Sequence, residues 1–226
     1  MTEATAITSF EITYRDDVAL SYTPAPAAVM ECHSHVLITS DGTWLIDPLD
    51  VPGLDALLEG LPPVVGVLVL LDRHLRDSEA IAARYDVDAW VPAGTRTRSA
   101  RTYDDTVPNT PFEIVTTRDI PGWHERALWW PEERILVCAD VIGSAQYFRV
   151  GDDALAVHPL LRMVPPSILR RLDPRLVLVG HGPGVDHDAA AALSSALASS
   201  RRRSLRLALD APRRLLRWGA SPRNGC

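Results

Sequence analysis

Residues 64–85, VVGVLVLLDRHLRDSEAIAARY, decide how the rest of the chain is interpreted. They begin with a continuous apolar run, which is typical of a strand buried on both faces, and an amphipathic helix is predicted to begin near Ser78. A short polar turn lies between the two. Because ligand-binding groups of layered α/β proteins collect at the carboxyl ends of strands, this turn is a candidate site. Its candidate side chains are Asp72, His74 and Asp77.

The composition is that of a soluble globular protein. The 226 residues suit one large domain, and 46% of them are hydrophobic and 23% charged. No apolar stretch approaches the ~20 residues that span a membrane, and no basic segment followed by an apolar run suggests a secretory signal. Three cysteines, Cys32, Cys138 and Cys226, are an odd number that makes no disulfide framework. We therefore expect a cytoplasmic protein with no membrane partner.

The charge is distributed unevenly along the chain. Residues 201–226 hold eight arginines against one aspartate, a local charge of +7 that leaves −13 on residues 1–200. An acidic body argues against nucleic acid as the main partner. We predict one domain over residues 1–205 and a basic, arginine-rich tail over 206–226. The tail is expected to be solvated or to pack on its own acidic body.

Hydrophobic patterning outlines the remaining elements. Antiparallel strand pairs are predicted within 10–22, 29–46 and 127–137, where alternating apolar residues flank turn residues. Single strands are predicted at 88–91, 112–115 and 176–179, and helices at 52–59, 165–172 and 189–209. Two segments with little periodicity, 94–111 and 141–159, are predicted to be long loops, a kind of segment that often carries function.

Several further polar residues stand at predicted strand ends or turns. His181 lies between two glycines, which would let the backbone approach a neighbour closely. Asp140 and Asp47 follow strands and can equally cap turns. His33 and His35 alternate on one face of a strand, and we favour exposed histidines over a metal-binding pair there.

The order of these pieces resembles the metallo-β-lactamase superfamily over about residues 10–205. The shared features are paired hairpins, an IDP strand end at 46–48, a PG-x-H turn at 121–124 and a GHG strand end at 180–182. The resemblance implies an α+β fold, an αββα four-layer sandwich of two mixed β-sheets face to face with helices on both outer faces. Most members are hydrolases that use one or two Zn, Fe or Mn ions to activate water.

The signature turn of that superfamily, HxHxDH, is degenerate here. Residues 72–77 are DRHLRD, so His74 keeps the second histidine, while Asp72, Arg76 and Asp77 replace the first histidine, the aspartate and the third histidine. The next family histidine is displaced by one residue, behind Trp123. The resemblance thus implies the metal ligands Asp72, His74, His124, Asp140 and His181.

Arg76 changes the chemistry that the resemblance implies. A guanidinium stays protonated and has no acceptor, so it cannot bind a metal ion, and we expect one metal site rather than two. A single Zn, Fe or Mn ion would activate water to hydrolyse an ester, thioester or lactone, with Asp140 or Asp77 as the base. Arg76 and Trp123 are the expected substrate-binding residues of this small-molecule hydrolase.

The alternative is a metal-free member of the fold. In that hypothesis Arg76 occupies the former metal pocket and binds a small anion or metabolite, and the protein serves binding or regulation. A histidine in a turn, such as His74, is by itself more often a hydrogen-bonded surface residue. Trp123 is equally explained as a core or rim residue.

Overall fold

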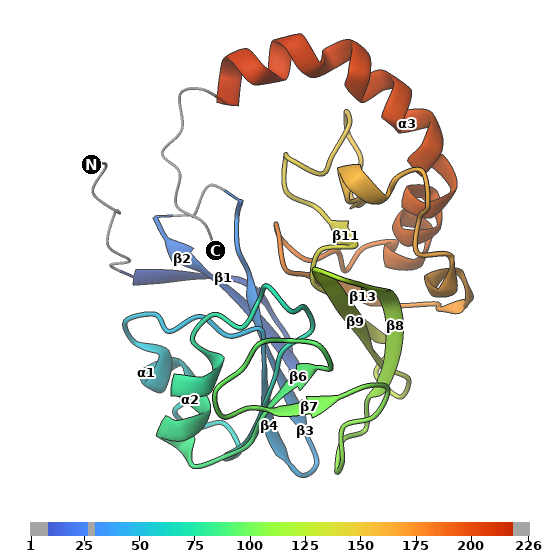
Figure 1. Cartoon of the computed structure of the whole chain (residues 1–226). Coiled ribbons are helices and arrows are strands. Elements are labelled where there is room, and N and C mark those ends of the chain that lie inside the picture. Colours follow the sequence, from blue (N-terminus) through green and yellow to red (C-terminus); the bar gives the residue numbers. More distant parts are fainter. Residues whose placement is uncertain (1–8, 27–29, 219–226) are drawn as a thin grey trace.

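Two β-sheets face each other, with helices on their outer faces (Figure 1). The computed structural model describes residues 9–26 and 30–218. The larger sheet has seven strands in chain order: β1 (Ser9–Arg15), β2 (Ala19–Ala25), β3 (Ser34–Thr39), β4 (Gly42–Ile46), β5 (Val64–Leu68), β6 (Ala89–Pro92) and β7 (Arg101–Tyr103). Its first four strands are antiparallel and the last four, from β4 onward, are parallel, so the sheet is mixed.

The second sheet has the strand order β13-β10-β9-β8. Its strands are β8 (Glu113–Ile120), β9 (Trp123–Trp130), β10 (Ile135–Cys138) and β13 (Leu176–Val179), with β13 parallel to β10 and the others antiparallel. A short pair, β11 (Ile142–Gly143) and β12 (Ala156–Val157), adjoins it. The predicted α+β sandwich of two mixed sheets is confirmed.

The helices complete the outer layers. The larger sheet is covered by α1 (Leu54–Leu58) and α2 (Ser78–Tyr85), and the smaller one by α3 (Ala189–Trp218) with the 3₁₀ turns η1 (Pro159–Leu161) and η2 (Ser167–Arg171) (Figure 1). One apolar cluster lies between the larger sheet and its helices, including Leu54 and Ile81. A larger cluster fills the space between the sheets and beneath α3.

The central apolar run behaves as predicted. All residues from Val67 to Leu71 are fully buried, and burying each such side chain stabilises the fold by roughly 1.5–3 kcal/mol. The backbone N–H of Val69 donates to the Trp90 carbonyl, so extended pairing continues past the end of β5. The polar turn therefore begins at the end of the extended segment, next to buried residues between the two sheets.

Both predicted loops are more structured than their sequences indicate. Residues 94–111 include β7, and Glu79 Oε1 accepts hydrogen bonds from the backbone N–H groups of Arg98 (2.8 Å) and Ser99 (2.7 Å). Residues 141–159 contain β11 and β12 and the fully buried Phe148. Hydrogen bonds between side chains and backbone order the first segment, and short strand pairs order the second. These interactions leave no repeating pattern in the sequence.

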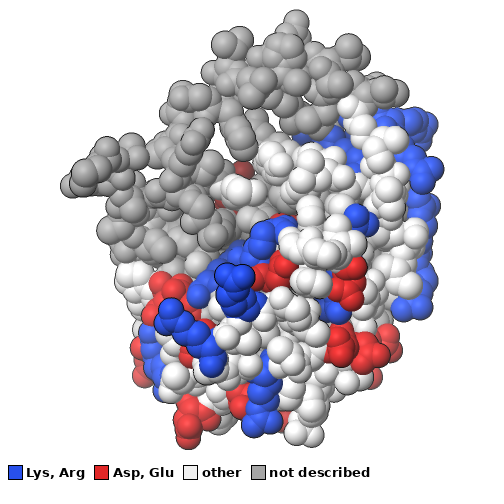
Figure 2. Space-filling model, viewed as in Figure 1, with Lys and Arg blue, Asp and Glu red and all other residues white. Residues whose placement is uncertain are grey.

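The carboxyl-terminal helix is longer than predicted. It continues through Trp218, beyond the expected end at 209 and across the proposed boundary at 205. Figure 2 shows arginine side chains gathered along the edge where α3 lies. The division into a domain and a tail stays a prediction, and residues 219–226 lie outside the described part of the chain. Within the described residues, no helix has the length and apolar character to cross a bilayer.

Candidate metal centre

His74 is held in a fixed orientation at the end of the central strand. Its side chain is buried, and its Nδ1 atom lies 3.0 Å from Asp47 Oδ2. Asp47 follows β4, and its other oxygen, Oδ1, accepts a hydrogen bond from the Leu70 backbone N–H at 2.8 Å. One carboxylate therefore joins the ends of two neighbouring strands and sets the ring plane of His74.

His181 reaches the same place from the end of β13. Its Nδ1 atom lies 3.0 Å from the Met30 carbonyl oxygen. Both flanking glycines are required, because a Cβ atom at Gly180 would lie 2.8 Å from the Ala139 carbonyl oxygen and one at Gly182 would lie 2.3 Å from the Ala145 nitrogen. The GHG sequence therefore allows the close packing that brings His181 to the cluster.

Asp140 completes the cluster after β10. Its Oδ1 atom lies 3.3 Å from His74 Nε2 and 3.0 Å from His181 Nε2. Its Oδ2 atom accepts a hydrogen bond from Arg73 Nη2 at 3.0 Å. In the described part of the chain, these three side chains are the group whose potential ligand atoms lie within 4.8 Å of one another.

The hydrogen bonds of the two imidazoles determine which nitrogen faces Asp140. A carboxylate and a carbonyl can only accept, so the Nδ1 atoms of His74 and His181 carry hydrogens. In neutral rings both Nε2 atoms then carry a lone pair that is directed at Asp140 Oδ1. Three acceptors meeting at one point require a proton or a cation between them.

The local electrostatics agree with that requirement. Although burial and Arg76 oppose a charged ring, the Asp140 and Asp47 carboxylates hold the pKa of His74 above its ordinary value. Burial would raise the pKa of Asp140, but the neighbouring His74 and His181 keep it well below the usual range. The cluster therefore favours an ionised Asp140 with a positive charge beside it, next to the two histidines.

The chemistry of this donor set fits a divalent metal ion. Two imidazole nitrogens and one carboxylate oxygen are a set that zinc, iron and manganese accept, and three protein ligands leave coordination positions open. The contacts of Nδ1 with Asp47 and with the Met30 carbonyl are the outer hydrogen bonds that usually orient metal-binding histidines.

Two of the five expected ligands lie outside the cluster. In β9 successive side chains alternate, so Trp123 and Glu125 are buried while His124 turns outward and lies 2.6 Å, Nδ1 to Oδ1, from Asp119. The displacement of the histidine by one residue therefore puts it on the other face. Asp72 donates its backbone N–H to the His124 carbonyl, and its side chain lies near Arg73.

The other expected site residues are also placed individually. Asp77 Oδ2 accepts the Asp50 backbone N–H at 2.9 Å, at the start of α2 and away from the triad. The Cζ atom of the Arg73 guanidinium lies over the Trp123 ring, 4.5 Å from the ring centroid. Arg76 donates through Nη1 to the carbonyl oxygens of Asp47 and His33.

Glu125 supports the cluster from beneath. Its Oε1 atom accepts the backbone N–H groups of Asp140 (2.7 Å) and Val141 (2.8 Å), and its Oε2 atom accepts the Trp123 indole N–H (2.7 Å). Burial, with a contribution from Asp140, raises the pKa of Glu125 to about 8. This side chain fixes the backbone of Asp140 and the indole on which Arg73 rests.

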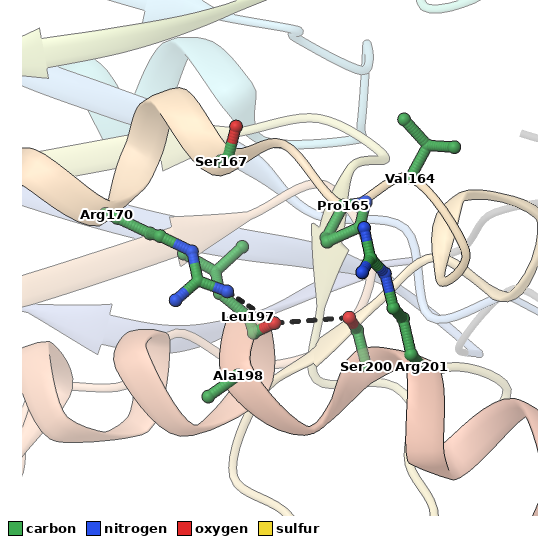
Figure 3. Close-up of a pocket in the computed structure, with 8 residues that line it drawn as sticks. All are labelled: Val164, Pro165, Ser167, Arg170, Leu197, Ala198, Ser200 and Arg201. Carbon is green, nitrogen blue, oxygen red and sulfur yellow. Dashed lines mark hydrogen bonds between the residues drawn. The ribbon is translucent and has the colours of Figure 1, made fainter.

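A separate pocket lies between η2 and α3, and Figure 3 shows the arginines that flank it. Arg170 Nη2 donates to the Leu197 carbonyl at 3.2 Å, and Arg201 Nε donates to the Met163 carbonyl at 3.1 Å. Its lining contains no histidine, cysteine or carboxylate: Val164, Pro165, Ser167, Arg170, Leu197, Ala198, Ser200 and Arg201. It therefore offers no metal ligands and is distinct from the cluster.

Comparison with known proteins identifies the fold. The chain matches no protein-family model and no curated protein in sequence. A metallo-β-lactamase from Pontibacter korlensis matches with a TM-score of 0.62 at 15% identity, over 84% of this chain and 99% of that one. The metallo-β-lactamase FIM-1 from Pseudomonas aeruginosa, in its mono-zinc form, matches with a TM-score of 0.61 at 13% identity, over 88% and 97%. The fold is that of the metallo-β-lactamases.

Within the metallo-β-lactamase fold, the motif positions that keep the family residue are the ones that the structure brings together. His74, Asp140 and His181 meet, whereas His124 contacts Asp119 and Asp77 accepts the Asp50 backbone N–H. Asp72 lies outside the group, and Arg76 is held beside His74 through Asp47. Sequence reasoning missed Arg73 and Glu125, and it placed His33 and His35 on the surface although both are buried. The alternation of Trp123 and Glu125 on one strand face is a signal that could have revealed Glu125.

His158 is buried among aromatic side chains beside the triad, and this predicts how the stability of the protein depends on pH. His158 packs edge-on against Trp123 and Phe148, and burial lowers its pKa to about 4. The unfolded chain binds this proton near pH 6.5, so it holds more protons than the folded chain between pH 6.5 and 4. The free energy of unfolding is therefore expected to fall as the pH decreases through this window, measured by urea unfolding.

The control for this prediction is His158→Asn. Asparagine does not titrate, and it can still accept the Leu160 backbone N–H that His158 Nδ1 accepts at 3.2 Å. The variant should lose stability less steeply below pH 6.5, with a residual slope from His33 and His35, whose pKa values burial also lowers. Identical pH profiles for the two proteins would remove His158 as the cause.

Proposed function

We propose that this protein is a hydrolase that uses one divalent metal ion held by His74, Asp140 and His181. One observation carries the proposal. Two Nε2 lone pairs and a carboxylate oxygen converge at 3.0–3.3 Å, while both Nδ1 atoms are already engaged by acceptors. The proposed substrates are small molecules with an ester, thioester or lactone bond.

A bound divalent ion would supply polarisation of a carbonyl group and a lowered pKa of water. The residues of the chain supply position and charge. Asp47 keeps the His74 ring in the tautomer that presents Nε2, and Arg73 keeps Asp140 oriented through Oδ2. Asp77 accepts a backbone N–H outside the triad, so Asp140 is the favoured residue to handle a proton there.

The arrangement favours one ion over two. In the signature turn Arg76 stands where the superfamily has a metal-binding aspartate, and it cannot serve as a ligand. The substituted Asp77 is engaged with Asp50 at the start of α2. A second metal ion would therefore lack two of its ligands and would face the positive charge of Arg76.

Metal content tests the proposal directly. The protein would be purified without a polyhistidine tag or chelator, dialysed against Zn²⁺ or Mn²⁺ and measured by inductively coupled plasma mass spectrometry. We expect about one ion per chain in the native protein. His74→Ala and His181→Ala should each reduce metal affinity by at least about tenfold, since each removes one of three ligands.

His187→Ala is the matched control, because the His187 side chain is 94% exposed and lies outside the triad. It should bind metal as the native protein does. Hydrolysis of ester, thioester and lactone panels should depend on the added metal and be lost in His181→Ala. Absence of stoichiometric metal after loading with either ion would overturn the proposal.

A second candidate function follows from Arg73. The Arg73 guanidinium already partly neutralises the negative charge of Asp140. A proton on His74 could neutralise the remaining charge, and the cluster would then be stable without a metal ion. The protein would then bind a small anion without hydrolysing it. A metal-free native protein that binds anions would favour this candidate over the hydrolase.

A further inference from the structure

Arg76 presents one unused edge of its guanidinium. The Nη1 atom donates to the carbonyl oxygens of Asp47 (2.7 Å) and His33 (2.8 Å), which anchors the group. The Nε and Nη2 atoms are shielded from solvent and have no hydrogen-bond partner among the described residues. A buried donor without an acceptor is costly, so these N–H groups call for a ligand.

The backbone that presents Arg76 is itself unusual. Arg76 has a φ of +44°, in the left-handed region that residues other than glycine, asparagine and aspartate seldom adopt. Strain of this kind persists only where the surroundings enforce it, and it gathers at binding sites. Here the hydrogen bonds of Nη1 to the Asp47 and His33 carbonyls hold the Arg76 side chain in place.

The unused edge has a defined chemical preference. The Nε–H and one Nη2–H of a guanidinium are parallel and coplanar, which matches the two oxygens of a carboxylate. A single hydroxyl or carbonyl oxygen would have to accept both hydrogens in a bent geometry, whereas an oxyanion gives each donor its own oxygen. An oxyanion that offers two oxygens, such as a carboxylate, is therefore the ligand that completes Arg76.

Arg76 is also linked to the triad through Asp47. The Asp47 carbonyl accepts the Arg76 Nη1 at 2.7 Å, and the Oδ2 atom of the same residue lies 3.0 Å from His74 Nδ1. The His33 Nδ1 atom lies 2.7 Å from the Glu31 carbonyl and so carries the hydrogen, which makes Nε2 an acceptor. That Nε2 is likewise shielded and unpartnered in the part of the chain that the structure describes.

We propose that Arg76 binds a carboxylate group of the substrate through Nε and Nη2, next to the triad. The substrates are then anionic esters, thioesters or lactones that carry a carboxylate beside the bond to be cleaved. This inference rests on the proposed hydrolase function for its substrate class. The binding of a carboxylate by Arg76 itself does not require the metal.

Nitrogen-15 NMR of the Arg76 Nε–H tests the binding step without reference to activity. Formate and acetate would be titrated into metal-free and metal-loaded protein labelled at arginine. We expect a saturable shift of one Nε–H resonance, assigned to Arg76 by its absence from Arg76→Lys. That variant keeps the positive charge but loses the parallel Nε–H and Nη2–H donors, so its affinity for carboxylates should fall at least about tenfold.

Arg171→Gln is the control, because Arg171 is an exposed arginine outside the site, and it should titrate as the native protein does. Titration of the native protein needs no variant to fold. Absence of a saturable shift in both forms of the native protein, or equal affinity in Arg76→Lys, would overturn the proposal. A failure of the metal measurement alone would sink the hydrolase and leave carboxylate binding standing.

A pair of esters tests the substrate class. One ester would carry a free carboxylate, and the other would have that carboxylate methylated. The metal-loaded native protein should prefer the anionic ester by at least about tenfold in kcat/KM, and Arg76→Lys should lose this preference. Carboxylate binding at Arg76 with no preference between the esters would overturn the assignment of the carboxylate to the substrate.

Discussion

Replacing Glu125 with alanine is expected to lower the free energy of unfolding by about 3–5 kcal/mol. The Glu125 side chain is fully buried and accepts three N–H groups, from the backbones of Asp140 and Val141 and from the Trp123 indole. Each donor left unsatisfied costs about 1–3 kcal/mol, and the truncation also leaves a cavity. Urea unfolding monitored by tryptophan fluorescence would measure the loss.

Two further variants make the result specific. Glu125→Gln keeps an oxygen for the two backbone N–H groups but turns an NH₂ group toward the Trp123 indole N–H, so it should cost clearly less than alanine. Glu132→Ala, on the exposed β9–β10 turn, should stay within about 0.5 kcal/mol of the native protein. Equal stabilities of Glu125→Ala and Glu132→Ala would contradict the supporting role of Glu125.

The layered fold could be predicted because it depends on patterns that repeat. Alternation in β1 and β2 indicates strands with one buried face, and the continuous apolar run through Leu71 indicates a strand buried on both faces. These elements appear in the order of the metallo-β-lactamase fold. The same patterns carry no information on segments held by single polar bonds. The pinning of residues 98–100 by Glu79 is such a case.

The site was predictable only where residue type and chain position coincide. His74, Asp140 and His181 each follow a predicted strand that enters the core. Since β5 lies in the larger sheet and β10 and β13 lie in the smaller one, the convergence of the three side chains follows from the packing of the two sheets face to face. His124 follows the same logic but lies one residue too late, and the period of two in a strand sends it outward. Sequence shows the shift but does not fix which face is buried.

The partners of the triad were harder to foresee. Arg73 reaches Asp140 because the Trp123 ring supports its guanidinium, a contact between positions 50 residues apart in sequence. His33 and His35 were predicted to be exposed, yet both side chains are buried. His35 lies in β3, an interior strand of its sheet, and His33 precedes that strand and donates its backbone N–H to the Gly180 carbonyl. Long-range packing decides such cases, and local pattern does not record it.

Asp47→Asn is expected to reduce metal affinity by about 10–100-fold while leaving the fold intact. Asparagine tolerates the positive φ of residue 47, and its oxygen can still accept the Leu70 backbone N–H. Its NH₂ group would then face His74 Nδ1, which must become an acceptor and move the ring hydrogen to Nε2. A protonated Nε2 donates to Asp140 and has no lone pair for a metal ion.

Competition with a chromophoric chelator would measure the affinity, and nitrogen-15 NMR of the imidazoles would report the tautomer of His74. Asp41→Asn, the same chemical change in the exposed β3–β4 turn, should leave both unchanged. Native affinity in Asp47→Asn would show that the triad does not depend on the tautomer that Asp47 imposes. Weaker metal binding with an unchanged tautomer would instead assign the role of Asp47 to its negative charge, because the two effects of the carboxylate are then separated.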